Sequence, residues 1–130
     1  MRFIVSEIKQ RGQMTLVTGS TSIGTIEGIW IPRDLPKIGE YYHVALNITC
    51  PTQQSIPSRK HPSPSVRLEN DTVYFTGICE DMDEEVYYLR FDLDWLEMLL
   101  LEEIPSKKKI GDEISFSANI YGISIYPYTI

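Results

Sequence analysis

The sequence has few of the residues that cross-link a chain or anchor it in a membrane. Its 130 residues include two cysteines, Cys50 and Cys79. Their spacing fits no metal site, and cytosolic disulfides are uncommon, so both are expected to be plain thiols, Cys79 within a core strand. The longest aliphatic run, Met98–Leu101, is far too short for a membrane helix, and the first ten residues lack the apolar core of a secretory signal. A cytoplasmic protein without a membrane segment is therefore expected.

Candidate catalytic and metal-binding residues are also few. The two histidines, His43 and His61, are far apart in the sequence, and neither accompanies a nucleophile pattern. Asp92 and Asp94 alternate on one expected strand face and could form a carboxylate pair for acid–base work. Half-exposed strand residues are the simpler interpretation of that pair. The sequence therefore predicts a protein that is not an enzyme, with no catalytic residue, no metal site and no cofactor.

The feature that recurs along the chain is the residue alternation typical of β-strands. Its hydrophobic fraction of 42% and charged fraction of 23% are ordinary for a globular protein. Short β-branched and aromatic runs with period two alternate with turn residues along the whole chain. We expect one all-β domain over residues 1–130, a small curled antiparallel sheet or barrel of about seven to nine strands with at most one short helix.

The stretch from Val73 to Glu103 organises this pattern. VYFTGICED and VYYLRF are apolar, aromatic-rich runs on either side of the acidic segment MDEE, which predicts a β-hairpin. From Glu80 to Glu103 there are ten carboxylates against Arg90 alone, a local net charge of −9. The whole chain carries −6, so the remaining residues sum to +3. The negative charge is thus concentrated around one hairpin.

This concentration of charge is the main indication of function. A cluster that repels itself is preorganised to attract a basic partner, so we expect a protein-binding surface there. A divalent cation is an alternative, but the cluster lacks the glycine and the closing bidentate position of a calcium loop. A simple solvated turn is the other alternative. The expected partner-binding residues are those of the hairpin tip, with two aspartates as a flank: Glu80, Asp81, Asp83, Glu84, Glu85, Asp92 and Asp94.

Residues 93–103 are ambiguous. Through Trp95 the odd positions are apolar, but from Leu96 to Leu101 both faces are apolar. Asp94 and Glu97 could form a helix capping box, yet Glu102 and Glu103 would then sit at the unfavourable end of the helix dipole. We therefore expect the strand to continue through this segment, buried on both sides, with a short helix as the alternative.

Two further segments have a recognisable organisation. KIGEYYHVALNI at 37–48 and KIGDEISFSANI at 109–120 share five of twelve positions, and each places a glycine just before an expected strand. Residues 49–65 hold four of the eight prolines and the basic cluster Arg59, Lys60 and His61. A loop of that length in a compact domain is usually functional or mobile.

The net charge argues against nucleic acid as the partner. Eight tyrosines on a small barrel are compatible with base stacking, but a net charge of −6 opposes the phosphate attraction that dominates such binding. Arg59 and Lys60 with the run at 107–109 could form a basic patch, although solubilising loops are the simpler interpretation. A small-barrel module that binds a ligand or nucleic acid remains the alternative function.

Several pieces together resemble a class of small bacterial all-β immunity proteins that are encoded beside secreted polymorphic toxins. The pieces are KIGEYYHVALNI, VYFTGICED, the acidic turn followed by VYYLRF, KIGDEISF and the closing ISIYP, which span roughly residues 24–130. The resemblance implies a cytoplasmic, stoichiometric inhibitor that masks a toxin without catalysis of its own. Combined with the acidic hairpin, it predicts that the partner is a basic toxin domain.

Overall fold

The fold is entirely β, and the predicted all-β class is confirmed. The computed structural model describes residues 1–54, 63–105 and 107–129, which form eleven strands and two three-residue 3-10 turns with no α-helix. In chain order the elements are β1 Arg2–Arg11, β2 Met14–Thr21, β3 Gly24–Trp30, β4 Tyr41–Ile48, β5 Thr52–Gln54, β6 Ser65–Glu69, β7 Thr72–Met82, β8 Val86–Asp92, β9 Trp95–Leu100, η1 Leu101–Glu103, β10 Glu113–Asn119, η2 Ile120–Gly122 and β11 Ile123–Tyr128.

The first four strands and the last one close into a five-stranded barrel in the order β1-β2-β3-β11-β4. β11 makes the closure, because it pairs antiparallel with β4 and parallel with β3. It can lie so close to β3 because residue 28 is a glycine. A Cβ atom at Gly28 would lie 2.7 Å from the carbonyl oxygen of Ile123, a close backbone approach that a glycine within a strand permits.

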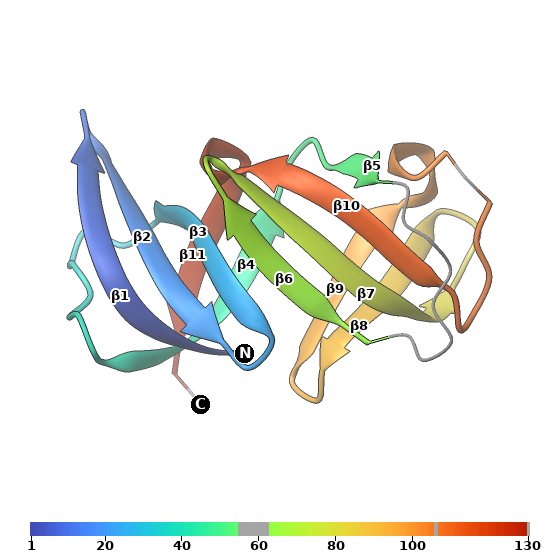
Figure 1. The fold of residues 1–130 in the computed structure, drawn as a ribbon, viewed down its shortest axis with the longest axis horizontal. Coiled ribbons are helices and arrows are strands. Elements are labelled where there is room, and N and C mark those ends of the chain that lie inside the picture. The colour runs from blue at the N-terminus through green and yellow to red at the C-terminus, as the bar shows by residue number, and fades with distance from the viewer. Residues whose placement is uncertain (55–62, 106, 130) are drawn as a thin grey trace.

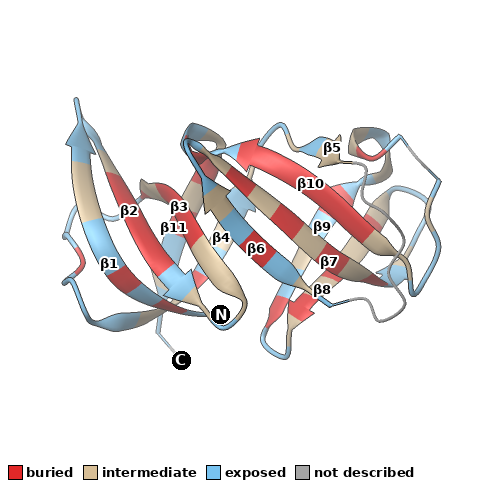
Figure 2. Ribbon diagram, viewed as in Figure 1, coloured by how far each residue is buried: buried red, intermediate tan, exposed pale blue. Residues whose placement is uncertain are grey.

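The middle of the chain forms a second sheet in the order β5-β10-β7-β8-β9. β7 is its long central strand, and it pairs with β10 on one edge and with β6 and then β8 on the other. Buried and half-buried residues alternate along β7 (Figure 2), as expected of a strand with one face on a core. β9 is the edge strand, and the predicted hairpin is formed by β7 and β8.

The barrel and the second sheet meet where β3 lies beside β6 (Figure 1). The Val66 N–H donates to the carbonyl of Ile23 at 3.2 Å, and buried residues of both parts belong to one core cluster. Under the second sheet the core is aromatic. Phe75 stacks on Phe116 at 4.8 Å between ring centres, and Phe91 stacks on Trp95 at 4.9 Å.

The predicted strand entries at the two KIG segments are confirmed. Gly39 has φ +88° and Gly111 has φ +95°, a left-handed region that favours glycine. β4 begins two residues after the first glycine and β10 two residues after the second. Cys79 is buried in β7 and Cys50 is exposed, and both are free thiols.

The expectation of one continuous, two-sided buried strand through residues 93–103 is wrong. β8 ends at Asp92, a turn follows, and β9 returns antiparallel to β8. The Arg90 guanidinium holds this turn by donating to the carbonyls of Asp92 and Leu93. Leu93 is 96% exposed, so the apolar pattern that suggested a continuing strand includes a residue that lies in water. Strand is nevertheless the conformation of β9, and η1 is a single 3-10 turn.

Candidate functional site

The predicted acidic tip closes the β7–β8 hairpin. The carboxylate of Asp83 accepts hydrogen bonds from the backbone N–H of Glu85 at 2.8 Å and of Val86 at 2.9 Å. It also accepts one from the Tyr88 hydroxyl at 3.1 Å. These bonds, first those from the backbone, lower the pKa of Asp83. Asp83 therefore holds the turn in shape, while Asp81, Glu84 and Glu85 are exposed beside it.

Glu80 has a different environment from the rest of the tip. Its carboxylate forms a two-pronged ion pair with Arg90, with nitrogen–oxygen distances of 3.2 Å and 2.9 Å. Arg90 is the only base between residues 80 and 103, and the same guanidinium holds the β8–β9 turn. Much of the charge on Glu80 is thus compensated within the protein, and the field of the tip comes mainly from the other four carboxylates.

The two flanking aspartates lie away from this tip. Asp92 accepts hydrogen bonds from the Ser22 hydroxyl and from the backbone N–H of Leu93, and these bonds lower its pKa. Asp94 lies 3.9 Å from the amino nitrogen of Met1. β8 has seven residues, which at about 3.3 Å per residue puts roughly 20 Å between its ends. The structure therefore divides the seven acidic residues: four lie at the hairpin end of β8 (Asp81, Asp83, Glu84 and Glu85), and Asp92 and Asp94 lie at its other end. Glu80 is held between them by Arg90, whose guanidinium also bonds the β8–β9 turn.

Between the two groups lies a feature that the sequence reading missed. Leu96, Met98 and Leu100 are 40%, 67% and 43% exposed, and they alternate with Trp95, Glu97 and Leu99 along β9. They stand directly opposite Arg90, Tyr88 and Val86 of β8, so all six share one side of the sheet. We call this surface, made by Val86, Tyr88, Arg90, Leu96, Met98 and Leu100, the β8–β9 outer face.

The signal for this face was present in the sequence. An Asp-Leu-Asp segment after a period-two run is a turn signature, because an aspartate side chain can bond the backbone just after it. Placing the turn there assigns Leu96, Met98 and Leu100 to one side of a new edge strand. When residues 93–103 are interpreted as a continuation of the preceding strand, this turn is left out, and Leu96, Met98 and Leu100 are not assigned to an edge strand of their own.

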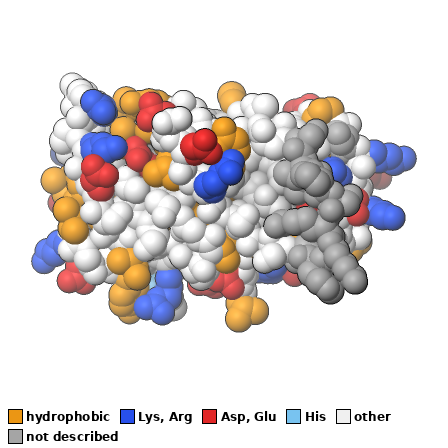
Figure 3. Space-filling model, in the orientation of Figure 1, with side chains coloured by type: hydrophobic (Ala, Val, Ile, Leu, Met, Phe, Trp, Pro, Cys, Tyr) orange, Lys and Arg blue, Asp and Glu red, His pale blue; other side chains and the backbone are white. Residues whose placement is uncertain are grey.

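Charge elsewhere on the described surface is less concentrated. On the face shown in Figure 3, acidic and basic side chains lie near one another over β1 to β3. Lys107, Lys108 and Lys109 follow η1, where the Lys108 N–H donates to the Tyr87 hydroxyl at 3.1 Å. The predicted cluster of Arg59, Lys60 and His61 lies outside the described residues. His43 packs between the rings of Tyr41 and Tyr128.

Neither a metal centre nor a membrane helix is found in the part of the chain that the structure describes. No three His, Cys, Asp or Glu side chains there gather closely enough to hold a metal ion. No helix among those residues is long and apolar enough to cross a bilayer. The chain matches no family model, no curated protein and no solved structure, so its function must be inferred from its own surface.

Proposed function

We propose that this protein is a non-catalytic binding protein that docks on a basic protein partner through the β8–β9 outer face and the acidic tip. The partner we propose is a bacterial toxin domain, which makes the protein an immunity-type inhibitor. One observation carries this proposal: a row of exposed apolar side chains lies on an edge strand with carboxylates at both ends. Exposed apolar rows with a polar border are typical of protein interfaces.

The chemistry of the outer face fits that role. Tyr, Met and Arg are enriched in protein interfaces, and Tyr88, Met98 and Arg90 stand side by side on this face. Among the described residues no strand pairs with the outer edge of β9, so its backbone groups can bond an extended segment of a partner. The acidic tip at one end supplies a long-range field for a positively charged surface, and the apolar row supplies short-range contact.

The apolar contribution can be tested with exposed side chains only. We expect Leu96→Ser together with Met98→Ser to weaken binding of the partner at least tenfold, because central interface side chains typically carry most of the binding energy. The partner to test first is the product of the adjacent gene, and binding is measured by titration calorimetry. Folding should be unaffected, since surface substitutions usually change stability by less than about 0.5 kcal/mol.

Leu35→Ser together with Ile38→Ser is the matched control for that variant. These residues are 55% and 66% exposed in the loop before β4, so the control removes the same kind of surface away from the outer face. Equal binding by the two double variants would show that the outer face does not contact the partner. Salt-sensitive, micromolar binding of single-stranded DNA or RNA by the protein would favour the nucleic-acid module instead.

The electrostatic contribution is tested by removing three charges without disturbing the turn. We expect Asp81→Asn, Glu84→Gln and Glu85→Gln together to slow association with the same partner about tenfold at low salt, because complementary fields steer encounter. Asp83 is kept, since it bonds two backbone N–H groups of the turn. The association rate is measured by stopped-flow fluorescence, and the difference from the unmodified protein should shrink as salt rises.

A second triple variant separates the effect of the local field at the tip from the effect of the net charge on the association rate. Glu7→Gln, Glu40→Gln and Glu69→Gln remove three exposed carboxylates that lie on or beside β1, β4 and β6. This variant has the same net charge as the tip variant and should associate at nearly the unmodified rate. If both triple variants slow association equally, only the net charge matters and the tip is a solubilising turn.

A further inference from the structure

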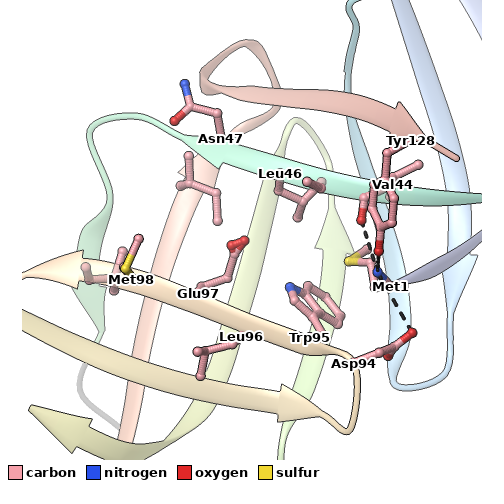
Figure 4. Close-up of a pocket in the computed structure, with 13 residues that line it drawn as sticks. Met1, Val44, Leu46, Asn47, Asp94, Trp95, Leu96, Glu97, Met98 and Tyr128 are labelled. Atoms are coloured by element: carbon pink, nitrogen blue, oxygen red, sulfur yellow. Dashed lines mark hydrogen bonds and ion pairs between the residues drawn. The ribbon is translucent and has the colours of Figure 1, made fainter. Parts of the chain in front are cut away.

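A cavity of about 310 Å³ lies between β4 of the barrel and β9 of the second sheet. It is on the opposite side of β9 from the outer face. Figure 4 shows Trp95 and Glu97 pointing from β9 toward β4, with Leu46 facing them from β4. The walls combine apolar and polar surface, and the residues that matter to the argument are Val44, Leu46, Asp94, Trp95, Glu97 and Tyr128.

Trp95 brings an unused hydrogen-bond donor into this cavity. Its side chain is 3% exposed, and its indole N–H has no hydrogen-bond partner among the described residues. Buried donors are nearly always paired, because an unpaired one loses its bonds to water without replacement. Trp30, the other tryptophan, follows this rule, since its indole N–H donates to the carbonyl of Asp34 at 2.9 Å. The donor of Trp95 is therefore available to an acceptor that enters the cavity, beside the Glu97 carboxyl that already lies near it.

Glu97 brings a carboxyl group to the same place. Burial raises the pKa of Glu97 to about 7, although the nearby Trp95 indole N–H and the amino group of Met1 partly offset the shift. The indole N–H lies close enough to influence the carboxyl but makes no hydrogen bond of normal geometry to it. The other ionisable groups at the cavity are the Met1 amino group, Asp94 and Tyr128, while Val44, Leu46 and Ile48 of β4 contribute apolar side chains.

We propose that this β4–β9 cavity binds a small organic molecule with an apolar body and an amide-type group. The carbonyl of the amide would accept from the Trp95 indole N–H, and its N–H would donate to the Glu97 carboxyl. An anionic carboxylate would be repelled by the ionised form of Glu97, while the Met1 amino group already compensates the charge of Asp94. An ammonium group would leave the indole donor unpaired, and a hydrocarbon would leave both polar groups unpaired. This site adjoins the proposed partner surface, because Leu96 and Met98 line both.

Benzamide is the probe for this proposal, with benzoate, benzylammonium and toluene as probes of the same ring size. The readout is the pair of indole N–H signals in a ¹H–¹⁵N spectrum of the full chain, where Trp30 is an internal control. We expect millimolar benzamide to shift the Trp95 signal and leave the Trp30 signal in place. The other three probes should bind more weakly than benzamide.

Two variants complete the test. Trp95→Phe keeps an aromatic ring for stacking on Phe91 and should weaken benzamide binding about fivefold, the effect of one lost hydrogen bond. Because this variant lacks the Trp95 signal, its affinity is measured from the backbone amide signals of β4 and β9 in the same spectrum. Leu46→Phe fills the cavity from β4 and should abolish the shift while keeping the Trp95 signal for observation. An unmoved Trp95 signal, an equal shift in Leu46→Phe, or unchanged affinity in Trp95→Phe would each overturn the proposal.

Discussion

Gly24→Ala is expected to lower the free energy of unfolding by about 3 kcal/mol, the cost of a residue forced into a glycine-only conformation with a backbone clash. Gly24 has φ +144°, which side-chain-bearing residues rarely adopt. A Cβ atom at this position would lie 1.9 Å from the carbonyl oxygen of Val66. Because that oxygen belongs to β6, the clash cannot be relieved by rotating a side chain.

The position of Gly24 makes the effect global rather than local. Gly24 is the first residue of β3 and lies where the barrel meets the second sheet, next to the hydrogen bond from Val66 to Ile23. Relieving the clash requires β3 and β6 to move apart, and this opens the core cluster that the two parts share. Urea unfolding followed by tryptophan fluorescence measures the change, since Trp30 lies in the barrel and Trp95 under the second sheet.

Gly12→Ala is the matched control for this prediction. Gly12 also has a positive φ, +64°, but no atom lies within 4 Å of its added Cβ. Its expected cost is only about 1 kcal/mol, that of the left-handed conformation alone. Equal losses in the two variants would mean that the contact with Val66 contributes nothing and that backbone strain explains both.

Local signals in the sequence were sufficient for most of the strands. Period-two runs predict strands because side chains alternate between the two faces of a sheet, and this property depends only on neighbouring residues. Gly39 and Gly111 marked the entries to β4 and β10 for an equally local reason. The acidic turn between VYFTGICED and VYYLRF was visible as composition, and the structure places a tight turn there that Asp83 holds.

The long-range features could not be predicted in the same way. Pairing of β11 with β3 joins residues that are far apart in the sequence, and no local pattern specifies a parallel pair across such a distance. Asp92 and Asp94 were expected to flank the acidic tip, and the length of β8 places them at its opposite end. Whether they bind the partner stays a prediction. The cavity between β4 and β9 depends on how the barrel and the second sheet meet. No local sequence pattern around Trp95 and Glu97 therefore predicts it.

The stability of the protein is expected to fall as pH rises from 5 to 8, because of Glu97. Its pKa is about 7 in the folded protein against an ordinary value of 4.5. The folded state therefore binds a proton more tightly than the unfolded chain, and its advantage is fully present below pH 4.5 and lost as pH rises through 7. A difference of about 2.5 pKa units corresponds to roughly 3 kcal/mol at most, since partial solvation reduces it.

Glu97→Gln should remove this pH dependence and make the protein more stable than the unmodified chain at pH 8, by as much as about 3 kcal/mol. Glutamine keeps the size of the side chain but never carries a charge into the cavity, so no desolvation cost appears at high pH. Urea unfolding at pH 5, 6, 7 and 8 provides the measurement.

Asp83 and Asp92 do not interfere, because their lowered pKa values confine their contributions to more acidic pH. Glu84→Gln, at an exposed carboxylate of the tip, is the control and should keep the slope of the unmodified protein. A stability that stays level or rises between pH 5 and 8 in the unmodified chain would show that water reaches Glu97 freely, and burial would then not raise its pKa.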